Sequence, residues 1–119
     1  TSFVQHAGIA AINDGGPFVA AMLAEYTQRR DVIAAGLNAI DGVVCPHPEG
    51  TFYAFPAIAR EWGDSADVAE RLLEHSGVLL TPGSAYGAAS RYHLRLSFAT
   101  SVDIIEEGMT RLRAAAANF

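Results

Sequence analysis

The sequence contains no lysine and only one cysteine, Cys45. All 8 basic residues are therefore arginine, and they stand singly or in pairs rather than in a run. With a formal net charge of -5, the chain lacks the basic patch typical of nucleic-acid binding, so we expect no nucleic-acid partner. A single cysteine excludes an internal disulfide, and it fits a small buried residue in a reducing cytoplasm.

Long apolar runs and metal-binding spacings are also missing. No uninterrupted apolar segment has the length of a membrane span, so we expect no membrane partner. The start of the chain has neither a charged leader region nor a methionine, so we expect no signal peptide and a chain that belongs to a longer polypeptide. The histidines are scattered without ligand spacing, and we predict no metal site.

The composition and the apolar periodicity indicate one α+β domain. Hydrophobic residues make up 50% of the chain and charged residues 18%, which is typical of a folded domain. Helices are predicted over residues 2–12, 17–41, 65–76 and 101–113, and strands over 43–45, 51–55, 78–81 and 92–99. Pairs of strands between helices favour a mostly antiparallel sheet of about four short strands with helices packed on it.

Arg95 is the first candidate site residue. The strand over 92–99 alternates an apolar face, which includes Leu94 and Leu96, with a face that carries His93, Arg95 and Ser97. An arginine fork on a rigid strand can bind a carboxylate through two parallel hydrogen bonds. The alternative is a solvated outer face of a half-buried sheet, and the pattern alone favours this alternative.

Two further segments are candidates for the wall of a ligand site. The loop from Pro82 to Gly87 combines two glycines, small residues and Tyr86. Such loops can approach a ligand closely, although most are only turns. Phe52 and Tyr53 lie at the start of a strand, where aromatic residues usually belong to the core and can also line a pocket.

Together, these segments resemble the C-terminal region of class I/II aminotransferases, which are fold type I enzymes dependent on pyridoxal phosphate (PLP). The loop after residue 80 contains Thr-Pro-Gly-Ser-Ala-Tyr-Gly, and Leu-Arg-Leu-Ser-Phe-Ala follows at residues 94–99. Residues 49–53 are similar to the family's strand in which glycine precedes aromatic residues. The resemblance covers residues 1–119 as a C-terminal small domain, and the long helix at about 17–41 is similar to the family's interdomain helix.

The resemblance implies transfer of an amino group between an amino acid and a 2-oxo acid. It implies that Arg95 binds the α-carboxylate of the substrate and that Phe52 and Tyr86 line the substrate pocket. The parent protein would be a cytoplasmic, PLP-dependent transferase of amino-acid metabolism. It would have a large domain N-terminal to this chain and would assemble as a homodimer.

The missing lysine limits what the chain does alone. A Schiff base with PLP requires a lysine amine, so we expect no catalytic or cofactor-binding residue in these 119 residues. We also expect no PLP bound to the chain alone and no activity from it. Apolar faces that meet a large domain would be exposed in isolation, so we expect the isolated chain to associate or to be poorly soluble.

Other interpretations stay open. Some bacterial transcription regulators carry an aminotransferase-like domain behind a DNA-binding domain, and residues upstream of Thr1 would separate them from enzymes. Other fold type I enzymes, such as carbon–sulfur lyases, share this C-terminal region. A free-standing α+β module that binds a small molecule is the third interpretation, and it predicts that Arg95→Ala leaves ligand binding unchanged.

Overall fold

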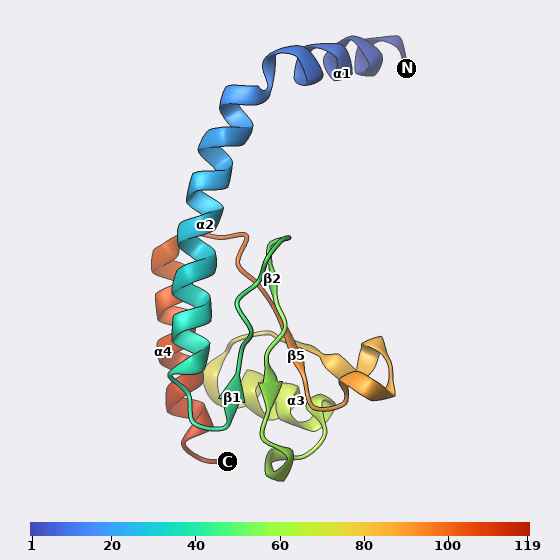
Figure 1. Cartoon of the computed structure of the whole chain (residues 1–119). Coiled ribbons are helices and arrows are strands. Elements are labelled where there is room, and N and C mark those ends of the chain that lie inside the picture. Colours follow the sequence, from blue (N-terminus) through green and yellow to red (C-terminus); the bar gives the residue numbers. More distant parts are fainter.

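Two helices form an arm that leads into the body of the molecule (Figure 1). In the computed structural model, which describes every residue from Thr1 to Phe119, α1 (Ser2–Asp14) and α2 (Gly16–Asn38) are bent by 72° relative to each other. Pro17 lies in the first turn of α2, where a missing N–H costs no helical hydrogen bond. Neither helix alone is long and apolar enough to cross a membrane, and the two meet that length and composition only as a bent pair.

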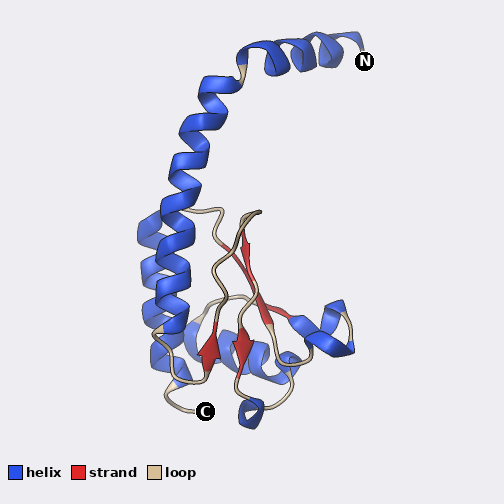
Figure 2. Ribbon diagram, viewed as in Figure 1, coloured by secondary structure: helices blue, strands red, loops and turns tan.

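The strands form two small antiparallel groups that continue into one another (Figure 2). β1 (Val43–Val44) pairs with β3 (Ala57–Ile58), and β2 (Tyr53–Ala54), β5 (Leu94–Ser97) and β4 (Thr81–Pro82) form a sheet of order β2-β5-β4. The main chain joins the groups, because Ile58 N–H donates to the Tyr92 carbonyl at 2.8 Å and Leu94 N–H to that of Pro56 at 3.0 Å. The predicted α+β class with an antiparallel sheet is confirmed.

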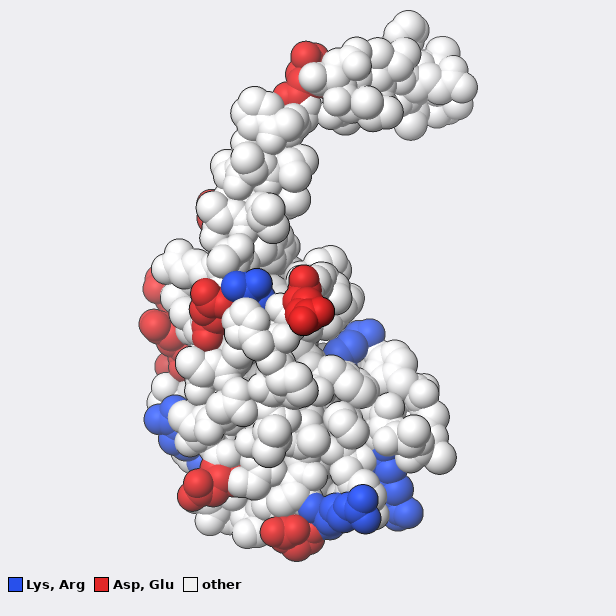
Figure 3. Space-filling model, in the orientation of Figure 1, with Lys and Arg blue, Asp and Glu red and all other residues white.

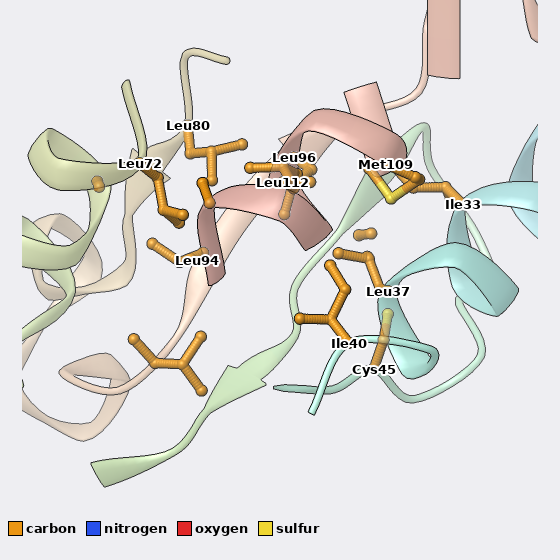
Figure 4. Close-up of a cluster of buried hydrophobic side chains, with 14 of the residues drawn as sticks. Ile33, Leu37, Ile40, Cys45, Leu72, Leu80, Leu94, Leu96, Met109 and Leu112 are labelled. Carbon is orange, nitrogen blue, oxygen red and sulfur yellow. The ribbon is translucent and has the colours of Figure 1, made fainter. Parts of the chain in front are cut away.

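One face of the sheet packs against α3 (Ser65–Ser76), α4 (Val102–Ala116) and the second half of α2. Figure 4 shows the core that these elements share, with Leu94 and Leu96 of β5 beside Leu72 of α3 and Leu112 of α4. Gly36 allows α2 and α4 to approach closely, because a Cβ at this position would lie 2.5 Å from Cγ of Met109.

Capping residues mark the ends of α3 and the start of α4. Asp64 caps α3, since its side chain accepts a hydrogen bond from Ala66 N–H at 3.0 Å, and Gly77 ends this helix with a left-handed φ of 69°. Ser101 caps α4 by accepting from Ile104 N–H at 3.4 Å. The caps fix where α3 and α4 begin relative to the strands before them.

Several boundaries differ from the sequence prediction; the strand predicted over 92–99, for example, is Leu94–Ser97. Helix α2 ends at Asn38 instead of residue 41, because the Asn38 side chain accepts from Cys45 N–H and donates to the Cys45 carbonyl, both at 2.9 Å. The strand predicted over 51–55 is paired only at 53–54, since Thr51 adopts a φ of 62°. Beyond Pro56 a fifth strand, β3, was not predicted, and the strand predicted over 78–81 begins its pairing only at Thr81.

The arm, defined here as residues 1–24, has no packing partner within the chain. Its apolar side chains are open to solvent: Ile12 is 85% exposed and Phe18 is 72% exposed. Asp14 is its only charged side chain, and the arm is almost free of charge in Figure 3. The buried part of α2 begins at Ile33, so the apolar spacing predicted from Pro17 onwards packs in this chain only in its second half.

Candidate functional site

Arg95 lies in the middle of β5, on the face of the sheet that the core does not use. Its neighbours Leu94 and Leu96 are buried, and alternation along the strand directs Arg95 to the opposite side. Its Nη2 donates to Oγ1 of Thr81, the residue paired with it on β4, at 3.4 Å. Arg95 takes part in none of the chain's ion pairs. The half-buried guanidinium therefore has no anionic partner within the chain.

Two tyrosine rings flank this guanidinium. Its Cζ lies 4.5 Å from the ring centroid of Tyr53 and 5.2 Å from that of Tyr86. Both distances are within the range of cation–π attraction, which favours a charged group over an aromatic face. These contacts restrain the arginine without using its N–H donors, so donors remain for a ligand oxygen.

Further aromatic residues extend the row on either side. Phe52 lies 4.4 Å from Tyr53 and 6.4 Å from Tyr26, measured between ring centroids. On the other side, Phe55 lies 6.0 Å from Tyr86 and 5.2 Å from the His93 ring, on which it stacks. Nδ1 of His93 is buried without a hydrogen-bond partner.

The structure brings together two of the three predicted site residues. Arg95 and Tyr86 are in contact, whereas the ring contacts of Phe52 are with Tyr53 and Tyr26, one ring away from Arg95. Tyr53, which the sequence pattern indicated beside Phe52 as a core or pocket-wall residue and did not connect with Arg95, is its second aromatic neighbour. Its pairing with Ser97 puts it on the Arg95 face, and this register depends on strand pairing that no local pattern reveals.

The loop that carries Tyr86 is held tightly against β5. After β4 it continues as a short 3₁₀ helix, η2 (Gly83–Tyr86), whose first N–H donates to the His93 carbonyl at 2.8 Å. A Cβ on Gly83 would collide with the carbonyl oxygens of Ser90 and His93. Glycine at this position therefore allows the loop to approach the strand closely.

Electrostatic effects elsewhere are local. The Ala66 N–H and the Arg91 guanidinium hold the pKa of Asp64 below its usual value, and burial raises the pKa of the Cys45 thiol. The structure contains no group of three or more His, Cys, Asp or Glu side chains arranged to hold a metal ion.

The antiparallel sheet and its helices define an α+β domain of the kind found in fold type I aminotransferases. Residues 1–112 match the family model described as aminotransferase class I and II, and the chain belongs to this family. The resemblance drawn from the loop after β4 and the strand β5 is thereby confirmed at the level of the family.

Individual relatives agree with this assignment. The chain is 36% identical over 109 residues to LL-diaminopimelate aminotransferase of Nitratidesulfovibrio vulgaris, a match over 92% of the chain and 28% of that protein. The structure of alanine aminotransferase from Pyrococcus furiosus superposes with a TM-score of 0.92 at 29% identity, over 97% of this chain and 30% of that one. For aspartate aminotransferase from Rhizobium meliloti the TM-score is 0.90 at 35% identity, over 98% and 31%. The chain thus spans under a third of the length of these relatives.

Proposed function

We propose that this chain is the C-terminal domain of a PLP-dependent aminotransferase and that Arg95 binds the α-carboxylate of an amino-acid or 2-oxo-acid substrate. The observation that carries the proposal is the position of Arg95, whose guanidinium is flanked by Tyr53 and Tyr86 and has no acidic partner in the chain. Membership of the aminotransferase family supplies the reaction class.

In this proposal Arg95 orients the substrate. Two N–H groups of one guanidinium bind both oxygens of a carboxylate, which fixes the direction of the bond to the substrate Cα. Thr81 and Tyr53 restrain the guanidinium, so less conformational entropy is lost when the carboxylate binds. Tyr86 and Phe52 form the wall of the pocket, where their rings exclude water from the bound ligand.

The residues of this chain do not hold PLP by themselves. The cofactor is anchored by a lysine amine, and the chain has no lysine. PLP, when bound, acts as an electron sink for the substrate Cα, and its anchor and phosphate contacts lie outside these 119 residues in this proposal. The chain alone is then inactive, and its contribution is confined to substrate binding and to closing the site.

The exposed arm supports the proposal that α1 and the first half of α2 form an interface with another domain. Apolar side chains such as Phe3, Ile12 and Phe18 are at least 72% exposed, and a contiguous apolar surface of this kind marks an interface. In the proposed parent protein, α1 and the first half of α2 pack against an N-terminal large domain, and the whole assembles as a homodimer. Helix α2 then links the two domains.

The first experiment is the visible absorption spectrum of the full-length polypeptide that carries this domain, recorded before and after addition of amino acids. We expect a PLP band that changes with an amino donor, and the amino acids that produce the change identify the substrate. A colourless protein that is unchanged by added PLP would overturn the proposal. A protein that binds PLP and transfers no amino group would point to an aminotransferase-like regulator.

The role of Arg95 is tested in the same polypeptide with Arg95→Ala. Loss of two charge-assisted hydrogen bonds should raise KM for the amino acid by at least about 10-fold. Arg113→Ala is the matched control, because Arg113 is an exposed arginine on α4 that forms no ion pair. An equal KM in the two variants would contradict carboxylate binding by Arg95.

A further inference from the structure

Ser65 connects the first turn of α3 to the loop beside Arg95. It is one of two polar residues buried in the chain and has no exposed surface. Its Oγ accepts a hydrogen bond from Ser84 N–H at 3.0 Å, and its own N–H donates to the Arg91 carbonyl at 3.0 Å. Ser84 lies near the start, and Arg91 near the end, of the connection between β4 and β5, so one residue fastens both ends of this connection to the same helix.

A second contact at the same helix end acts in parallel. Asp64, which caps α3, pairs with Arg91, with Nε 2.8 Å from Oδ2. This side chain of Arg91 is 57% exposed, whereas the hydroxyl of Ser65 is fully buried. A buried hydrogen bond is less exchangeable with water, so the Ser65 contact defines the position of the loop more strictly than the exposed ion pair does.

Tyr86 lies within this fastened connection, two residues after Ser84. Ser84 is the second residue of η2, and Tyr86 is its last. Gly83, directly before Ser84, is already pressed against the His93 carbonyl, so η2 has little freedom to shift towards β5. The distance of 5.2 Å between the Tyr86 ring and the Arg95 guanidinium therefore depends on where Ser65 holds Ser84.

We propose that Ser65 is a positioning residue for the carboxylate site: its buried hydroxyl holds η2 so that Tyr86 restrains Arg95 in the orientation that binds a carboxylate. This inference rests on the proposed function of Arg95. It concerns a residue of α3 that lies outside the row of aromatic side chains and that touches no ligand. Its effect on the substrate is transmitted through Ser84 and Tyr86.

The test compares two competitive inhibitors of the full-length enzyme. One is the deaminated carboxylate of the responding amino acid, and the other is the primary amide of that carboxylate. Because the amide carries no charge, the inhibition constant of the amide divided by that of the carboxylate measures how strongly the enzyme prefers the carboxylate. A fall in this ratio means a loss of carboxylate recognition. Ser65→Ala should raise the inhibition constant of the carboxylate about three- to tenfold and leave that of the amide unchanged. A general loss of structure would not change the ratio.

Ser76→Ala is the matched control. Ser76 is the other buried polar residue, at the opposite end of α3; its hydroxyl donates to the Leu72 carbonyl within the helix and accepts from the Val78 N–H at 3.1 Å, and it forms no hydrogen bond with the connection between β4 and β5. Its loss should leave the ratio as in the wild type. An unchanged ratio in Ser65→Ala, or an equal fall in both variants, would overturn the positioning role.

Two further variants separate the possible failures. If Ser65→Ala does not fold, Ser65→Cys keeps a side chain of similar size that accepts the Ser84 N–H only weakly, and a fall in the ratio supports the inference whereas no fall overturns it. Arg95→Ala tests the proposed function itself. If the ratio is unchanged in Arg95→Ala, the proposal that Arg95 binds the carboxylate is wrong. If the ratio is lost with Arg95→Ala but not with Ser65→Ala, only the positioning role is wrong.

Discussion

Asp64 and Arg91 form an ion pair, 2.8 Å from Oδ2 to Nε, that joins the N-terminus of α3 to the loop after β4. The same carboxylate accepts the Ala66 N–H at 3.0 Å. Both contacts favour the charged form, with the backbone hydrogen bond contributing most, and they hold the pKa of Asp64 below its usual 3.8.

This lowered pKa predicts a loss of stability in acid. Because the folded state binds the proton of Asp64 more weakly than the unfolded state does, the contribution is complete above about pH 4 and is lost as the pH falls through the folded pKa. Asp64→Asn retains a capping side chain but neither the charge nor the ion pair. The variant should be less stable than the wild type at pH 7, and this difference should shrink towards pH 3 in denaturant titrations. Asp67→Asn, a first-turn substitution without an ion pair, is the control. A difference that is independent of pH would contradict the prediction.

The ring of Tyr53 predicts a selective effect on carboxylate binding. Tyr53→Phe keeps an aromatic face 4.5 Å from the Arg95 guanidinium, whereas Tyr53→Leu removes it. A cation–π contact contributes about 0.5–2 kcal/mol, so Tyr53→Leu should raise KM for the substrate about two- to thirtyfold. Tyr53→Phe should stay close to the wild type in steady-state kinetics. If the two variants behave alike, the ring does not restrain the arginine.

Two glycines on packed helices predict opposite changes in stability. Gly36→Ala would place a Cβ 2.5 Å from Cγ of Met109, and such overpacking costs about 1–3 kcal/mol, more than the helix propensity of alanine returns. Gly108 on α4 has no atom within 4 Å of the corresponding position, so Gly108→Ala should stabilise the domain by about 0.5–1 kcal/mol. Denaturant unfolding measures both changes. Stabilisation by Gly36→Ala would show that α2 and α4 are not held this close.

The exposed arm predicts that the isolated chain associates in solution. Ile12 is 85% exposed and Phe18 72% exposed, so replacing both with glutamine should reduce the average mass measured by light scattering. Leu79→Gln is the control, because Leu79 is 79% exposed but lies on the body of the molecule. A monomeric wild-type chain at moderate concentration, or an equal effect of the control, would count against association through the arm.

Local patterns predicted most of the fold because they act over a few residues. The Asp64 cap, the Gly77 end signal and the alternation around Arg95 each depend on neighbours along the chain, and all three appear in the structure. The third strand in chain order was not predicted. Its two residues follow Pro56, and they are defined as a strand by pairing with β1, which lies far from them in sequence.

The candidate site was only partly predictable for the same reason. The motif of the aminotransferase family singled out Arg95 and Tyr86, and the structure brings the two into contact. Tyr53 reaches Arg95 through the register of β2 on β5, and Ser65 reaches the loop across 19 residues of sequence. Contacts of this kind follow from tertiary packing, and a single strand or helix carries no local signal for them.

Helix α2 also has a mechanical consequence. Its 23 residues make a rod of about 35 Å, of which only the C-terminal half is buried against the sheet and α4. Because α2 is held only at its C-terminal half, a tilt of the whole helix by about 5° about this end moves its N-terminal end by about 3 Å. Arg95, Tyr53 and Tyr86 all belong to the part of the chain that packs on the buried half of α2. They would therefore move together with it as a rigid unit. The distances among these three residues would then stay constant, while their distance to a domain bound to α1 would change.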